Sequence, residues 1–507
     1  MKLLVISLSA LCCLWSTLVR SVHLFQLESY QFPGYMRALK TYKKRFLSPK
    51  TLFPMAVFAA LGAFAAYFTP LAAGLFLLIN PAQKMKKPLV FTPRVRRLCA
   101  VSVVLSAVIC LPGALVGVWA TAVSAAAAVI LTPYLLIAWG HICAPVEKAI
   151  SNRYIRDARR ILREHTRLKV VGITGSFGKT STKYFLYELL STKYNVYMTP
   201  GNFNTTLGVT RAVREGLQPQ HEIFLCEMGA RHVGDIAEIC ELAQPHMGII
   251  TSVGEQHLET FGSLERVLAT KLELYEAVKS KGEVLINIDS QPLREALPGL
   301  QGDIVACGEG GGYYATDISA GRDGLRFTIH TPEGESREFA TRLLGSANVQ
   351  NLTLAIACAH RLGVSLGQMV PAVRALRSVP HRLELKHSGD TTIIDDAYNS
   401  NPTGAKMALD ALALFPPCRV LVTPGLVELG SRESEENRRL GVYAASRCDM
   451  AVVVGEHNRA SICEGLLEGG LAQSNTITVK TVEEALKILP AGSKTVLLLN
   501  DLPDNYL

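Results

Sequence analysis

Three long apolar runs, separated by short basic segments, occupy the first 145 residues of the chain. Residues 3–19 are long enough for a marginal membrane span and lack the small-residue cleavage site of a secretory signal, so we expect an anchor. The second run, residues 52–79, is interrupted by a proline and a glycine. The third, residues 98–140, is about twice as long as one helix needs to cross a bilayer and predicts two spans that turn near residues 112–117. The pattern predicts an α-helical transmembrane region of four or five spans.

Basic residues gather between the apolar runs. They are Arg37, Lys40, Lys43, Lys44, Arg45 and Lys50 in the first loop, and Lys84, Lys86, Lys87, Arg94, Arg96 and Arg97 in the second. A basic helix is expected from Arg153 to Arg167. Because positive segments stay on the cytoplasmic side, this helix and the domains after it are expected in the cytoplasm of a multi-pass cell-membrane protein. If both basic loops are also cytoplasmic, residues 52–79 must enter the membrane and leave it by the same face. They are short for two spans, so four and five spans both remain open.

The charge of the chain is strongly asymmetric. Residues 1–169 carry 22 lysines and arginines against 4 acidic residues, whereas residues 170–507 carry 30 against 39. The basic groups flank apolar runs with few aromatic residues between them, which favours a membrane partner over nucleic acid. None of the 12 cysteines forms a C-x-x-C pair, which argues for reduced thiols and against a zinc ribbon or a disulfide framework.

The stretch from Val170 to Lys183, VVGITGSFGKTSTK, reads as a strand, a glycine turn and a helix that begins near Thr182. Such a P-loop points backbone N–H groups at an anion, while Lys179 reaches for terminal phosphates and the Thr180 hydroxyl binds Mg²⁺. The residues predicted to hold ATP here are Gly175, Ser176, Gly178, Lys179, Thr180 and Ser181. The spacing is the narrower form T-G-x-x-G-K-T rather than the general P-loop pattern.

Strands alternate with helices from residue 170 onwards, which is typical of parallel, doubly wound sheets. The expected strands are VVGIT, EIFLCEMG, MGIITSV and EVLINID in a first run, and TTIIDDA, RVLVTPG, MAVVVGE, NTITVK and TVLLLND in a second. Short strands near 303–340 and a helix from Ala347 to Leu362 separate the runs, and Pro380 and His381 mark a hinge. The predicted parts are a transmembrane region (1–145), a basic connecting helix (146–169), a doubly wound central ATP-binding domain (170–380) and a Rossmann-like C-terminal domain (381–507).

Three further residues are candidates for the chemistry. Glu227 ends a strand expected beside the P-loop strand, where a hard cation needs oxygen ligands. His257 follows another strand and is a candidate ligand for a second Mg²⁺, and Lys271 lies in the next helix. Taken singly, His257 would be an ordinary loop residue and Lys271 an ordinary exposed helix lysine.

Together the order E-M-G, G-x-x-H-L-E-x-F-G and T-K-x-E resembles the central domain of the Mur ligases, and most closely the branch that adds D-alanyl-D-alanine. The resemblance continues over about two thirds of the chain. Asn348 and Asn351 match the family's asparagines on the adenine side, and Arg382 matches its nucleotide-binding arginine. IIDDAYNSNP matches the motif that opens the C-terminal domain, where Asp396 and Asn399 would face the nucleotide.

The resemblance implies an ATP- and Mg²⁺-dependent ligase of peptidoglycan biosynthesis. The γ-phosphate would go to a carboxylate of a cell-wall precursor, and the amine of an amino acid or dipeptide would then displace phosphate. Lys179 would act in phosphoryl transfer, and Thr180, Glu227, His257 and a carbamylated Lys271 would hold Mg²⁺.

Several positions depart from the family pattern. Membrane segments stand where a soluble domain usually holds the UDP-sugar. The family's N-N pair reads Asn204-Thr205, its G-D-M-x-E-L-G turn reads PGLVELG around Leu426, and its K-G-S reads Leu499-Asn500-Asp501. The hypothesis that follows is an acceptor that is lipid-linked or otherwise presented at the membrane.

Alternative functions are separated by single features. A non-catalytic nucleotide-binding scaffold is favoured by the altered C-terminal motifs and opposed by the retained Lys179, Thr180, Glu227, His257 and Lys271. A poly-γ-glutamate synthase would not be expected to keep D-D-A-Y-N-S-N-P, and a subunit that amidates lipid II would be expected to carry four zinc-binding cysteines. A transporter is disfavoured because residues 98–140 contain no strongly polar group along a path through the membrane.

Overall fold

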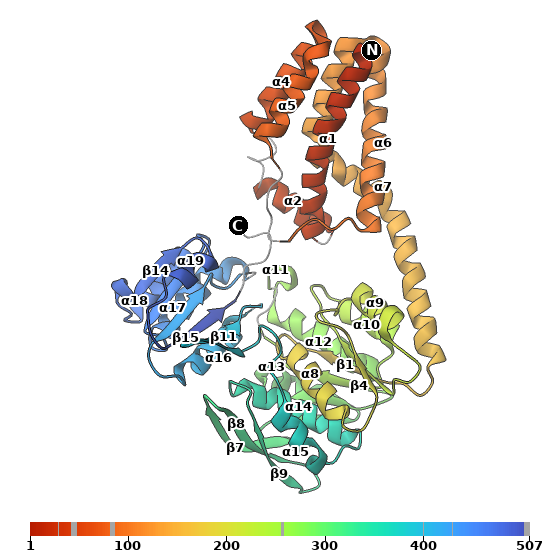
Figure 1. Cartoon of the computed structure of the whole chain (residues 1–507). Helices are drawn as coiled ribbons and strands as arrows, with labels where there is room; N and C mark the ends of the chain where they lie inside the picture. The colour runs from red at the N-terminus through yellow and green to blue at the C-terminus, as the bar shows by residue number, and fades with distance from the viewer. Residues whose placement is uncertain are drawn as a thin grey trace. The chain divides into compact units, whose positions relative to one another are not determined.

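The computed structural model describes residues 1–28, 30–41, 48–81, 87–254, 258–398, 400–427 and 429–500 (Figure 1). The chain forms two compact units that divide between Asn152 and Arg153. The first unit is helical, and the second contains all the β-strands of the described residues.

Among the described residues of the first unit lie six helical segments and the first part of a seventh. They are α1 (Lys2–Leu27), α2 (Phe32–Thr41), α4 (Pro49–Phe64), the 3₁₀ turn η1 (Ala66–Phe68), α5 (Thr69–Ile79), α6 (Pro93–Val116) and α7 (Val118–Glu164). By length and composition, α1, α6 and α7 could cross a membrane, whereas α4 and the η1–α5 segment are shorter apolar helices.

The apolar run at 52–79 folds back on itself. Pro70 lies in the first turn of α5, where the missing N–H of proline is tolerated, whereas Gly74 lies inside α5 and does not interrupt it, contrary to the prediction. The Asn80 amide donates to the Lys50 carbonyl at 3.0 Å and accepts from the Thr51 hydroxyl at 3.2 Å. The segment therefore begins and ends at the same end of the unit.

The long run at 98–140 forms the predicted antiparallel pair. Helix α6 passes through Pro112 and ends at Val116, and the next residue, Gly117, has a φ of 147° that allows the reversal. Arg97, near the start of α6, makes a two-pronged ion pair with Glu147 in α7, at 2.6 and 2.8 Å. The chain beside the second basic loop joins the same end, because His23 in α1 bonds to the Lys87 carbonyl at 2.8 Å. The described parts of both basic loops thus lie at the end from which α7 leaves.

The central domain is a six-stranded sheet in the order β2-β3-β1-β4-β5-β6, and every neighbouring pair is parallel. Its strands are β1 (Lys169–Thr174), β2 (Val196–Met198), β3 (Ile223–Glu227), β4 (Met247–Ile250), β5 (Val284–Asn287) and β6 (Ile304–Cys307). An antiparallel sheet follows, made of β7 (Tyr314–Gly321), β8 (Gly324–His330) and β9 (Ser336–Thr341). The four predicted strands are confirmed, and β2 was not predicted.

Helices cover both faces of this sheet, as a doubly wound fold requires (Figure 1). One face packs against α8 (Lys179–Leu190), α14 (Ala347–Arg361) and α15 (Leu366–Ala375). The other packs against α9 (Thr206–Gly216), α10 (Asp235–Ala243) and α12 (Leu264–Val278), while α11 (Leu258–Phe261) and α13 (Gln291–Ala296) are short. Two predicted boundaries are wrong: α8 begins at Lys179 rather than near Thr182, and the basic connecting helix is the end of α7, which stops at Glu164.

The last three turns of α7 belong to the core of the second unit. Ala158 is fully buried, and Ile155, Ile161 and Leu162 pack against the same apolar cluster under the sheet. Asp157 pairs with Arg214 of α9 at 2.8 Å. The apolar spacing of these residues explains why this basic stretch remains a helix after the apolar run has ended.

The C-terminal domain is a second six-stranded sheet, in the order β10-β11-β15-β12-β13-β14. Its strands are β10 (Glu384–Ser388), β11 (Thr391–Asp396), β12 (Arg419–Thr423), β13 (Met450–Val454), β14 (Thr476–Val479) and β15 (Lys494–Leu499). Only β10 runs antiparallel to its neighbour, and it was not predicted. The helices are α16 (Pro402–Ala413), α17 (Glu433–Ala445), α18 (Arg459–Glu468) and α19 (Val482–Lys487).

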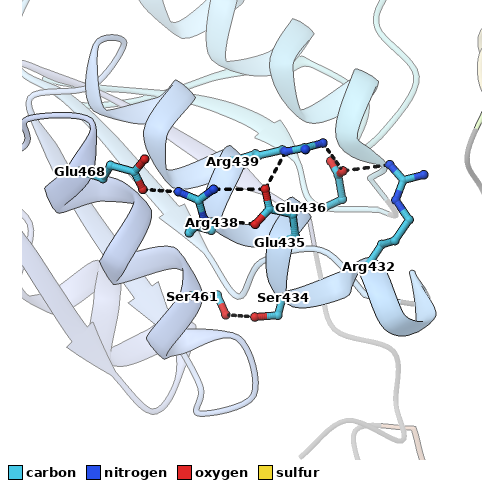
Figure 2. A network of polar contacts seen from close by, with 8 residues as sticks. All are labelled: Arg432, Ser434, Glu435, Glu436, Arg438, Arg439, Ser461 and Glu468. Atoms are coloured by element: carbon cyan, nitrogen blue, oxygen red, sulfur yellow. Dashed lines mark hydrogen bonds and ion pairs between the residues drawn. The ribbon is translucent and has the colours of Figure 1, made fainter.

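Helices α17 and α18 approach each other closely. A Cβ at Gly465 would lie less than 3.0 Å from the carbonyl oxygen of Arg438, so only glycine fits there. Figure 2 shows the charged network on this pair, in which Glu435 and Glu436 bind Arg439, and Arg438 bridges Glu435 to Glu468. Buried backbone contact and exposed ion pairs together hold the two helices.

Candidate active site

The glycine turn between β1 and α8 forms the centre of the site. Gly175 and Gly178 have φ angles of 150° and 83°, which residues other than glycine rarely adopt. A Cβ at Gly178 would lie less than 3.0 Å from the Asn351 side-chain oxygen. Helix α8 begins directly after this turn and its N-terminus has no side-chain cap. Its first N–H groups and the helix dipole are therefore available to an anion.

Lys179 folds over the turn. Its ammonium donates to the carbonyls of Gly175, at 2.6 Å, and Ser176, at 3.2 Å. Burial lowers the pKa of Lys179 to about 8, although the Glu227 carboxylate opposes the shift. Phosphate oxygens would replace these carbonyls as partners, which is the role predicted for Lys179.

Glu227 lies at the end of β3, directly beside β1, as predicted. Only 1% of its surface is exposed. Its Oε1 accepts from the Thr180 hydroxyl and the Asn204 amide, both at 3.1 Å, and its Oε2 lies 2.9 Å from the Lys183 ammonium. Burial raises the pKa of Glu227, but Lys183 and Lys179 together bring it below its usual range. A carboxylate and a hydroxyl side by side suit Mg²⁺, so the donor set fits this ion.

Lys271 is buried, unlike an ordinary helix lysine. It lies on the inner face of α12 and is 3% exposed. Burial first, and then the charge of Lys179, lower the pKa of Lys271 to about 7. Two residues further on, Glu273 accepts hydrogen bonds from the backbone N–H groups of Gly234 and Ala237, so it holds the start of α10. His257, the other predicted ligand, lies outside the described residues.

The asparagines predicted on the adenine side lie beside the turn. Asn351 of α14 accepts from the Thr182 hydroxyl at 3.4 Å, and its amide donates to the Asn348 side chain at 3.4 Å. The Asn348 amide in turn donates to the Leu344 carbonyl at 2.8 Å. The fold thus brings the glycine turn and the asparagine pair together, although they are far apart in the sequence.

The predicted residues at the start of the C-terminal domain also lie near one another. The Arg382 guanidinium lies 4.6 Å from the centre of the Tyr398 ring. Asp396 accepts from the Leu383 N–H at 3.1 Å, and burial raises the pKa of Asp396 to about 7. Asn399 lies outside the described residues. The predicted nucleotide contacts of Arg382 and Asp396 remain predictions.

The positions that depart from the family pattern have structural roles. Thr205 caps α9 by accepting from the Gly208 N–H at 3.2 Å. Leu426 is buried, its N–H donates to Asn437 and its carbonyl accepts from both Asn437 and Asn458. Asn500 donates to the Gly425 carbonyl and accepts from the Ser400 N–H. An uncharged hydrogen-bonded network therefore joins the carboxyl ends of β11, β12 and β15.

Sequence reasoning missed Lys183 and the contact between Asn204 and Glu227. The available signal for Lys183 was its spacing of one helical turn from Lys179, which places both on one side of α8. No local pattern pairs Lys183 with Glu227, because the pairing arises only when β3 lies beside β1.

Comparison with known protein families gives two matches. Residues 173–359 match the Mur ligase middle domain, and residues 381–499 match the Mur ligase, glutamate ligase domain. Neither match includes the first unit.

Two curated relatives carry the same name. The UDP-N-acetylmuramoyl-tripeptide--D-alanyl-D-alanine ligase of Bacillus subtilis is 33% identical over 304 residues, which are 59% of this chain and 65% of that protein. The ligase of the same name from Escherichia coli is 29% identical over 345 residues, 67% of this chain and 75% of that protein. The chain thus spans slightly less than two thirds of the length of the Bacillus protein.

Two solved structures of MurF are also similar to this chain. A crystal structure of MurF from Acinetobacter baumannii superposes with a TM-score of 0.63 at 30% identity, covering 69% of this chain and 77% of that one. MurF from Thermotoga maritima in complex with ADP gives a TM-score of 0.60 at 26% identity, covering 69% of this chain and 80% of that one.

Proposed function

Because the chain belongs to the Mur ligase family, we propose that it is an ATP-dependent ligase of the MurF type, which forms an amide bond on a cell-wall precursor. The observation that carries the proposal is the arrangement of Lys179, Thr180, Glu227 and Lys271 around the glycine turn. The Bacillus and Escherichia relatives bear names that specify UDP-N-acetylmuramoyl-tripeptide and D-alanyl-D-alanine. For this chain we propose a precursor carboxylate and an incoming amino acid or D-alanyl-D-alanine.

In this mechanism the protein orients phosphates and compensates charge. The N-terminus of α8 and Lys179 would hold the β- and γ-phosphates of ATP, while Thr180 and Glu227 would hold Mg²⁺. Mg²⁺ supplies electrostatic stabilisation of phosphate charge when bound. Phosphoryl transfer to the precursor carboxylate produces an acyl phosphate. The incoming amine attacks its carbonyl carbon and loses a proton, and phosphate leaves.

Lys271 is proposed to act as a carbamate. With a pKa of about 7, much of this amine is neutral under ordinary conditions and can react with CO₂, releasing one proton. The resulting carboxylate-like group, together with His257, would hold a second Mg²⁺.

We further propose that the first unit anchors the enzyme in the cell membrane with the catalytic domains in the cytoplasm. Most of the exposed large apolar side chains among the described residues belong to this unit. Hydrogen bonds bring the ends of the apolar segments that adjoin the basic loops to one end, and α7 leaves from that end. Crossings by α1, α6 and α7, with the chain start outside and residues 52–79 entering and leaving by the cytoplasmic face, satisfy the positive-inside rule at every basic segment. Fusions of a topology reporter to Gly117 and to the C-terminus should report opposite sides; the same side at both would refute this topology.

The acceptor is proposed to be lipid-linked or otherwise membrane-presented, because the residues before the central domain are apolar helices. The test is mass spectrometry of products from the detergent-purified chain with Mg-ATP and D-alanyl-D-alanine. Soluble UDP-N-acetylmuramoyl-tripeptide and its lipid-linked form are offered side by side, with Lys179→Met as the inactive control. A dipeptide-sized gain on the lipid-linked form supports both proposals, and a gain on the soluble form alone refutes the acceptor proposal. Mg-ATP binding with no product on either would favour a nucleotide-binding scaffold.

A further inference from the structure

Lys183 is a fully buried lysine that the mechanism above does not use. Its side chain has no exposed surface, and it lies in α8 one turn after Lys179. The ammonium donates to the carbonyls of Thr199 and Gly201, both at 2.8 Å, and lies 2.9 Å from Glu227 Oε2. Two of its three protons therefore have hydrogen-bond acceptors, and the charge is paired with the carboxylate. Burying a charge costs free energy unless the charge is paired in this way, so these contacts are what allow a lysine at this position.

Lys183 and its partners belong to three separate elements. Lys183 belongs to the P-loop helix, Thr199 and Gly201 to the segment after β2, and Glu227 to the end of β3. A further hydrogen bond, from the Glu227 N–H to the Thr199 hydroxyl at 3.1 Å, joins the last two. Lys179 points instead to the carbonyls of its own turn. Lys183 therefore faces the carboxylate rather than the phosphate cradle.

The two carboxylate oxygens of Glu227 contact different residues. Oε2 faces Lys183, whereas Oε1 faces Thr180 and Asn204. A cation held by Thr180 and Glu227 would meet Oε1, because Oε1 lies beside the Thr180 hydroxyl whereas Oε2 is ion-paired with the ammonium. The division also fixes the rotation of the carboxylate, since turning it would break contacts on both sides.

We propose that Lys183 is a positioning residue that holds Glu227 as a one-oxygen ligand for the Mg²⁺ of Mg-ATP. It also ties the start of the segment at 199–204, which carries Asn204, to the carboxylate that Asn204 contacts. The inference rests on the proposed function in one respect, namely that Thr180 and Glu227 hold Mg²⁺.

The experiment measures nucleotide binding rather than turnover. The affinity of the full-length, detergent-purified chain for ADP is determined by titration calorimetry, first in EDTA and then at increasing Mg²⁺ concentrations. Lys183→Met keeps the length of the side chain and removes the charge. Its affinity for ADP in EDTA should stay within about twofold, whereas the Mg²⁺ concentration for half of the Mg²⁺-dependent gain should rise about tenfold or more, as is usual when a partner of a metal ligand is removed.

A matched control and a double variant separate positioning from simple structural support. Lys193→Met removes a lysine that donates to the Gly363 carbonyl away from the site, and neither affinity should change. In a Glu227→Gln background, adding Lys183→Met should have no further effect, because the carboxylate to be positioned is gone. Comparing Glu227→Gln with the double variant also tests the inference if Lys183→Met alone does not fold, since the double variant leaves no unpaired charge.

Three outcomes overturn the inference. An unchanged Mg²⁺ dependence in Lys183→Met does so, and so does a further loss when the substitution is added to Glu227→Gln. If ADP binding by the unaltered chain does not depend on Mg²⁺ at all, both the inference and the proposed metal role of Glu227 fail. Strong Mg²⁺ dependence in the unaltered chain and none of the expected shift in the variant would leave the proposed function standing and remove the role of Lys183 alone.

Discussion

The burial of Lys271 leads to a quantitative prediction about its reactivity. With a pKa of about 7 in place of the ordinary 10.5, about 90% of Lys271 side chains are neutral at pH 8, against roughly 0.3% for an ordinary lysine. Only the neutral amine reacts with CO₂. Lys271 should therefore be favoured over an exposed lysine by a factor of about 300 in the reactive form alone.

The assay is ¹³C NMR of the detergent-purified chain in ¹³C-labelled bicarbonate. We expect a carbamate resonance at pH 8 that is absent from Lys271→Met and present in Lys193→Met, whose lysine is exposed. The signal should disappear as the pH falls through 7, because protonation removes the reactive amine. A resonance that survives in Lys271→Met, or no Lys271-dependent resonance at pH 8, would contradict this reasoning.

Four further variants test the packing at three glycines and one ion pair. Gly178→Ala should weaken ADP binding at least about tenfold in calorimetry, because the left-handed φ costs about 1–2 kcal/mol and the new methyl group overlaps a side chain of α14. Gly367→Ala is the control: this glycine is exposed in α15 with open space around it, so the substitution should raise the melting temperature slightly. Gly465→Ala should lower the melting temperature of the C-terminal domain, since its Cβ meets backbone of α17, and unchanged melting would refute the close contact. Arg97→Gln should destabilise the purified first unit by about 1 kcal/mol, because Glu147 loses a two-pronged partner that is partly exposed; equal thermal stability would show that the pair contributes nothing.

Local patterns accounted for much of the fold. Apolar segments bounded by turn residues located the central and C-terminal strands, and the glycine turn with Lys179 and Thr180 gave the predicted phosphate site. The exceptions have physical reasons. Strand β2 has only three residues, and β10 is an edge strand whose last residues are exposed, so neither has a clear apolar pattern.

The departures from the family pattern were harder to interpret from sequence. Thr205 retains a helix-capping role, because a hydroxyl can accept the N–H of Gly208. Leu426 and Asn500 belong to a packed network whose partners come from distant segments. Loss of charge at these positions therefore does not mean loss of structure.

The sequence by itself determined the order of the parts and the position of the glycine turn, and it supplied the prediction of which residues hold Mg²⁺, because these depend on neighbours a few positions apart. Only the tertiary structure decided that Lys271 is buried, that Lys183 is paired with Glu227, and that residues 52–79 return to their starting end. The physical reason is that burial and pairing depend on what surrounds a side chain. Those surroundings are assembled from strands and helices far apart in the chain.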